Sequence, residues 1–89
     1  SIMGDRKNFV LQEKGADTNT VFSSRQPRGA ALKAASRGHT DIRLRERGTN
    51  RVHVFKGSRD RVSAPSNAPG WLGNQVWKPN VKKIGVERC

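Results

Sequence analysis

The residues of this chain that could do chemistry are its cations and its two tryptophans. Eighteen lysine and arginine side chains stand against seven aspartates and glutamates, which gives a formal charge of +11 over 89 residues. So dense a charge favours a polyanionic partner, because the repulsion among like charges is otherwise uncompensated. Residues 1–41 carry a net charge of +3 and residues 42–89 a net charge of +8. We therefore expect the binding surface to draw mainly on the second half.

Both tryptophans lie in residues 68–79, APGWLGNQVWKP, which show neither helical nor strand periodicity. Proline and glycine flank Trp71 and Leu72, so this loop can present the two apolar side chains together at its tip. An apolar tip between cationic strands suits a wedge that enters between base steps and kinks duplex DNA. For Trp77 two interpretations stay open, namely a cover over the small core and a contact with DNA.

The sequence gives little support for catalysis, metal binding or membrane insertion. The carboxylates are scattered and no phosphate-cradling GxxxxGK[ST] motif is present, so we expect no enzyme activity, no catalytic residues and no cofactor. His39 and His53 are isolated and Cys89 is the one cysteine, which excludes zinc-finger spacing and an intrachain disulfide. No apolar run is long enough to span a membrane. We expect a soluble intracellular protein.

One helix is clearly predicted, in the segment QPRGAALKAASRG. Pro27 suits the first helical position and Gly38 the position just beyond the end. Ala31, Leu32 and Ala35 share one face, which is apolar but small. Such a helix can lie close to a sheet, and it is too weakly amphipathic to favour a membrane surface.

Two hairpins are predicted around this helix. Residues 8–14 and 20–24 form the first, with a loop longer than the tightest type. Residues 41–47 and 51–57 form the second, in which Val52 and Val54 point inward with Ile42 and Leu44. The arginines that alternate with Ile42 and Leu44 then make the outer surface of this hairpin strongly basic.

The predicted order is strand, strand, helix, strand, strand, long loop, strand. Residues 8–89 are expected to form a single compact domain of the α+β class, with curved antiparallel strands and one short helix. Residues 64–77 form a projecting arm loop rich in proline and glycine. Residues 1–7 are expected to be a flexible N-terminal segment, and SIMG has the character of a cloning remnant.

Taken together, these segments resemble the non-histone chromosomal proteins of methanogenic archaea. The resemblance runs through NFVLQEK, VFSSRQPRGAALKAASRG, IRLRERGT, RVHVFKG, APSNAPGW and KPNVKK, in the same order. It implies a monomeric α+β pseudo-barrel that binds duplex DNA, bends it sharply and prefers distorted DNA such as four-way junctions. The chain departs from the family at Ser58, where a second tryptophan is usual, and at Gly73, where proline is usual.

The resemblance also implies DNA-contacting residues. These are Arg25, Arg28, Arg51, Arg59, Pro69, Trp71, Lys78, Pro79, Lys82 and Lys83. The pattern of the residues adds Lys56, Leu72 and Trp77.

The leading hypothesis is an architectural, largely sequence-independent DNA-binding protein associated with the chromosome, or with viral DNA. An RNA-binding module of the ribosomal kind is the alternative, since it is also small and basic with exposed aromatic rings. A third hypothesis is a structural domain whose arm inserts into another protein.

Overall fold

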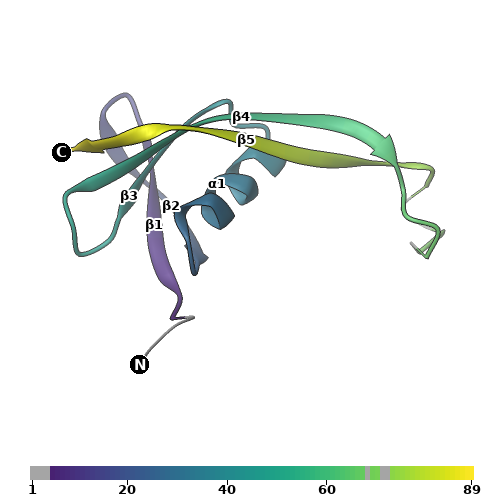
Figure 1. The fold of residues 1–89 in the computed structure, drawn as a ribbon, viewed down its shortest axis with the longest axis horizontal. Helices are drawn as coiled ribbons and strands as arrows, with labels where there is room; N and C mark the ends of the chain where they lie inside the picture. Colours follow the sequence, from purple (N-terminus) through teal and green to yellow (C-terminus); the bar gives the residue numbers. More distant parts are fainter. Residues whose placement is uncertain (1–4, 68, 71–72) are drawn as a thin grey trace.

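Short segments of alternating apolar residues form one antiparallel sheet, and a helix packs against one side of it (Figure 1). The computed structural model describes residues 5–67, 69–70 and 73–89. The strands are β1 (Lys7–Glu13), β2 (Ala16–Ser24), β3 (Asp41–Glu46), β4 (Arg51–Ser63) and β5 (Gln75–Arg88), and the helix is α1 (Pro27–Ser36). The strand order across the sheet is β2-β1-β3-β4-β5. The predicted α+β fold is confirmed.

The first hairpin turns more tightly than the sequence predicts. Lys14 and Gly15 connect β1 to β2, with φ angles of 53° and 78°. Two consecutive residues in the left-handed region match the twist of paired strands, which is why such turns close two-residue hairpins. The longer predicted loop is therefore wrong. The polar stretch ADTNT has the composition of a turn but forms the start of edge strand β2.

The core lies between the sheet and an alanine face of α1. The buried helix residues are Ala30, Ala31, Ala34 and Ala35. Facing them are the buried sheet residues Phe9, Leu11, Phe22, Ile42, Leu44 and Phe55. Alanine side chains are short, so the helix can approach the sheet closely. Leu32, predicted on the buried face, is only half-buried at its margin.

The predicted inward orientation of Val52 and Val54 is wrong. Phe55 pairs with Ile42 and His53 with Leu44, so His53 and Phe55 point toward α1. Val52 is buried as well, but on the opposite face of the sheet. Every residue from Val52 to Phe55 is apolar or aromatic, so alternation alone could not tell which pair faces the helix.

Beyond Lys56 the sheet narrows to two strands. β3 pairs with β4 as far as Lys56, after which β4 pairs with β5 alone, from Gly57–Val81 to Ser63–Gln75. We call residues 57–63 and 75–81 the ribbon, and the other elements the body. Figure 1 shows the ribbon extending away from the body, with the chain beyond it turning to the side on which α1 lies.

The boundaries of the arm differ from the sequence prediction. Strand β5 begins at Gln75, so residues 75–77 belong to the ribbon, and the connection between the strands covers residues 64–74. Regular pairing of Val76 with Val62 extends the strand. Pro79 is tolerated because β5 is an edge strand. Trp71 and Leu72 lie outside the described residues, as do residues 1–4 of the predicted N-terminal segment.

Gly57 marks the point where the ribbon leaves the body. Its N–H donates to the carbonyl of Thr40 (2.7 Å). A Cβ atom there would lie 2.6 Å from the backbone oxygen of His39 and 2.6 Å from Cδ1 of Ile42. Close contact with a backbone atom cannot be relieved by a side-chain rotation, so this position requires glycine.

We expect Gly57→Ala to destabilise the protein by about 1–3 kcal/mol, the usual cost of overpacking. Chemical denaturation followed by circular dichroism measures the change. The matched control is Gly85→Ala, also on a strand, where an added Cβ meets nothing within 4 Å. Equal stability of the two variants would contradict the close packing at Gly57.

Candidate nucleic-acid interface

The ribbon has two faces with different chemistry. Residues opposite each other on antiparallel strands share a face, and successive residues alternate between faces. Gly57 faces α1, so the residues in step with it also lie on that side. The helix-side face therefore carries Arg59, Arg61, Trp77 and Pro79. The outer face carries Ser58, Asp60, Lys78 and Asn80.

On the helix-side face, two arginines surround a tryptophan. Trp77 is 51% exposed, and the guanidinium carbons of Arg59 and Arg61 lie 4.5 and 5.6 Å from the centroid of its ring. These are cation–π contacts. The interpretation of Trp77 as a cover over the core is wrong, because the pairing with Arg61 places it on the ribbon. Neither arginine has a carboxylate partner among the described residues.

The entry of α1 adjoins the inner end of this face. Arg28 Nη1 donates to the carbonyl of Val81 (3.4 Å), which ties the first helical turn to β5. Arg28 and Lys83 line one recess together with His53 and Phe55. Arg25 is exposed just before the helix begins. Arg28 and Lys83 thus place two cations beside the inner end of the helix-side face, and the described residues of that face include no carboxylate.

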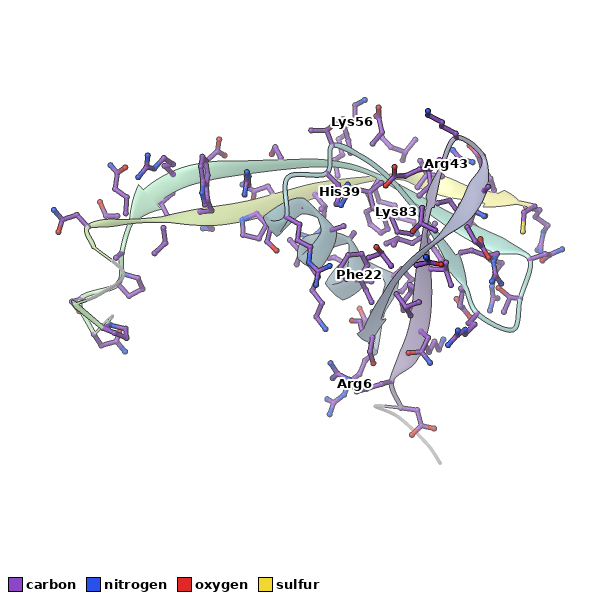
Figure 2. The ribbon with its side chains drawn as sticks, turned by 180° about the vertical axis from the view of Figure 1, so that it is seen from behind. Arg6, Phe22, His39, Arg43, Lys56 and Lys83 are labelled. Atoms are coloured by element: carbon purple, nitrogen blue, oxygen red, sulfur yellow. The ribbon has the colours of Figure 1, made fainter. Side chains whose placement is uncertain are left out.

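The outer face is less positive. Lys82 pairs across the strands with Lys56, and Lys78 pairs with Asp60. Lys56 Nζ also donates to Asp41 (2.7 Å), and this hydrogen bond lowers the pKa of the Asp41 carboxyl. Figure 2 shows Lys56 on the side of the sheet away from α1. Two carboxylates therefore reduce the charge of this face.

The basic outer surface of the second hairpin is neutralised by ion pairs. Arg43 binds Glu87, and Arg45 binds Asp17 through both carboxylate oxygens (2.8–3.1 Å). The hydrogen bond from Arg43 lowers the pKa of Glu87. Hydrogen bonds from Arg45 and then Gln12 lower the pKa of Asp17. Arg43 and Arg45, which were predicted to make this surface strongly basic, are thus each held by an acid distant in the sequence.

Arg51, a predicted DNA contact, lies in a cluster of cations around the buried carboxylate of Glu46. Its Nη2 donates to Oε2 of Glu46 (2.7 Å), and His53 Nε2 donates to Oε1 (3.0 Å). The charged Nζ of Lys7 lies 3.9 Å from Oε2 of the same carboxylate. Burial opposes ionisation of Glu46, but the hydrogen bonds from His53 and Arg51 outweigh it and lower the pKa. Arg51 therefore stabilises a buried carboxylate.

The predicted contact residues are thus divided by the fold. Arg28, Arg59, Trp77, Pro79 and Lys83 lie on the helix side, whereas Lys56, Lys78 and Lys82 lie on the outer face. Arg25 is exposed just before α1. Pro69 is exposed in the connection between the strands. The candidate set omitted Arg61. Its spacing of two from Arg59 on a strand would have placed both on one face.

Within the described ranges, no helix is long and apolar enough to cross a membrane, and no cluster of side chains has the composition of a metal site.

Comparison with known proteins gives consistent matches over nearly the whole chain. The family model described as non-histone chromosomal protein MC1 matches residues 5–89. Chromosomal protein MC1c of Methanothrix soehngenii is 59% identical over 86 residues, covering 97% of this chain and 96% of its own length. Chromosomal protein MC1 of Methanosarcina barkeri is 48% identical over 88 residues, covering 92% and 95%.

A solved structure of a complex between DNA and an archaeal MC1 protein is also similar. Its protein chain superposes with a TM-score of 0.71 at 47% identity, covering 97% of this chain and 99% of that one.

The Glu46 cluster should make stability sensitive to acid. A carboxyl whose pKa is lowered by folding contributes stability above its unfolded pKa, about 4.3 for glutamate, and this is lost as the pH falls through the folded pKa. We expect Glu46→Gln to cost about 1–3 kcal/mol at pH 7, because charge-assisted hydrogen bonds are lost in a buried site. The difference from the parent protein should shrink as the pH falls below the unfolded pKa and close once the pH is below the lowered folded pKa. Urea unfolding across this range measures it.

Glu87→Gln is the matched control. Its carboxylate also binds an arginine but is 57% exposed, against 9% for Glu46, so stability at pH 7 should change little. If the two variants lost equal stability, the special role of the buried cluster would be refuted.

Proposed function

This chain belongs to the family of the non-histone chromosomal protein MC1, and we propose that it is an architectural protein that binds duplex DNA and bends it. The observation that carries the proposal is the basic surface formed by the helix-side face of the ribbon and the entry of α1. Its residues are Arg25, Arg28, Arg59, Arg61, Trp77, Pro79 and Lys83.

The distribution of ion pairs favours this surface over the others as the binding site for DNA. Four carboxylates, those of Asp17, Asp41, Glu46 and Glu87, bind cations of the body. A cation already paired with a carboxylate gains less from a phosphate than an unpaired one, because the carboxylate must first be displaced. The helix-side cations whose side chains make no hydrogen bond or ion pair with the described residues, Arg25, Arg61 and Lys83, are therefore the preferred phosphate ligands. Lys78 and Lys82, on the outer face, contribute longer-range attraction.

The shape of the surface favours bending. The ribbon extends from the body, and the connection at its end turns to the side of α1 (Figure 1). A duplex that follows both the ribbon and the helix entry must curve to keep its contacts. Smooth bending of 20–30 base pairs costs on the order of 1–6 kcal/mol. Phosphate contacts and the exposed Trp77 ring must supply that energy, and Trp71 and Leu72 keep their predicted role as a wedge.

Several narrower properties follow from this proposal. Phosphate contacts carry no sequence information, so recognition should depend on DNA deformability and favour distorted sites such as junctions. We expect a monomer associated with the chromosome, with a structural and not a catalytic role. The RNA-binding alternative is not supported, because the similar curated proteins are chromosomal proteins and the similar solved structure is a complex with DNA.

One titration tests binding and bending together. A duplex of about 25 base pairs with a fluorophore pair at its ends is titrated at several salt concentrations. Binding gives the affinity, and energy transfer at saturation gives the bend. Arg61→Gln should make the slope of log K against log[salt] shallower by about 0.9, the effect of one phosphate contact. The matched control Arg43→Gln, which removes a paired arginine, should leave the slope unchanged.

Two results would contradict the proposal. Energy transfer that stays at the level of free DNA at saturation would exclude bending. A larger change in slope for Arg43→Gln than for Arg61→Gln would place the DNA on the face of the sheet away from α1.

A further inference from the structure

Arg59 makes contacts within the protein that Arg61, two residues away on the same face, does not make. Its Nη1 donates to the carbonyl of Ser36 (3.1 Å), in the last turn of α1. The guanidinium also lies close to Gly38, where an added Cβ would be 3.4 Å from Nη2. The carbonyls at a helix C-terminus carry partial negative charge, so a cation bound there is stabilised.

The same guanidinium stacks on Trp77, 4.5 Å from the ring centroid. Arg59 belongs to β4 and Trp77 to β5, so one side chain links both strands of the ribbon to the end of the helix. A planar guanidinium can donate in its plane and stack through its face at the same time, which an ammonium group cannot do.

This link lies where the ribbon has few other supports. At its inner end the ribbon is held by the Gly57 N–H to Thr40 and by Arg28 to Val81. Beyond these two contacts, toward the tip, a single hydrogen bond joins the described part of the ribbon to the body, and it runs from Arg59 to Ser36. Farther out, the described residues of the two strands hydrogen-bond to each other. Arg59 is therefore placed to hold the direction of the ribbon relative to α1.

We propose that Arg59 is a positioning residue, which fixes the angle of the ribbon against α1 through Ser36 and Trp77, and that it is not a phosphate ligand. This reverses the DNA contact implied for Arg59 by the family resemblance. The helix carbonyl and the Trp77 ring occupy its guanidinium. The guanidinium of Arg61 lies farther from that ring (5.6 Å), donates no hydrogen bond to the described residues and remains available. The effect on DNA rests on the proposed function, while the effect on the free protein does not.

The first test uses the free protein. Backbone ¹⁵N relaxation should show order parameters of about 0.85 in the ribbon of the parent protein, the value for rigid backbone. Arg59→Gln should lower them at residues 61–63 and 75–77 and leave β1 to β3 unchanged. Arg59→Lys should behave like Arg59→Gln, because lysine keeps the charge but cannot donate to Ser36 while stacking on Trp77. The matched control Arg61→Gln should leave ribbon order unchanged.

The second test measures binding to a 25-base-pair duplex over a range of salt. Arg59→Gln should weaken binding by roughly three- to tenfold, because the ribbon must then be ordered at the moment of binding. The salt slope should stay that of the parent protein, whereas loss of a phosphate ligand would make it shallower by about 0.9.

The outcomes separate the two ideas. Unchanged ribbon order in Arg59→Gln, or parent-like order in Arg59→Lys, would overturn the positioning role. A shallower salt slope for Arg59→Gln would restore Arg59 as a phosphate ligand and overturn the proposal, whatever the ribbon order. Failure of the parent protein to bind DNA would refute the proposed function, and the relaxation experiment would still decide the role of Arg59.

Discussion

The register of β4 against β5 is the constraint on which the candidate site depends. Beyond Lys56 the two strands have no other neighbour in the sheet, so their pairing alone decides which side chains share a face. Gly57 sets the phase, because its close approach to Ile42 and the His39 carbonyl fixes one face toward the helix. With that face of β4 fixed, a slip of one residue in the pairing would turn Trp77 and Pro79 of β5 to the outer face, and the contact of Arg59 with the Trp77 ring would be lost.

The distribution of carboxylates decides which of the faces set by this register stays positively charged. A charge of +11 on a small chain attracts nucleic acid to any exposed surface. Ion pairs on the body restrict that attraction, since Arg43, Arg45 and Arg51 each hold an acid from another part of the chain. The helix side of the ribbon has no such acid among the described residues. We therefore expect the placement of the DNA to depend on where the protein is neutralised as much as on where it is charged.

Sequence reasoning found the elements more readily than their orientation. Pro27 and Gly38 bounded the helix correctly because both act locally, one by lacking an N–H and one by adopting a positive φ of 97°. The face of β4 was misassigned because Val52 and Phe55 are both apolar, and the choice between them depends on pairing with β3.

The candidate site could be predicted only in part, because its faces also depend on the pairing between strands. The cations of the ribbon could be listed from the sequence, but their division between two faces needed the register of β4 and β5. The ion pairs of Arg43 with Glu87 and of Arg45 with Asp17 join residues 44 and 28 positions apart, which no local pattern indicates. Arg61 was the avoidable omission, because strand alternation alone links it to Arg59.

The most direct measurement uses Lys82 and Lys83, consecutive lysines whose side chains lie on opposite faces of β5. Acetylation of lysine amines with and without a DNA duplex, read by mass spectrometry, compares their accessibility within one molecule. The account predicts that DNA protects Lys83, beside Arg28 at the helix entry, and leaves Lys82 reactive. Protection of Lys82 with Lys83 still reactive would place the duplex on the outer face and contradict the account.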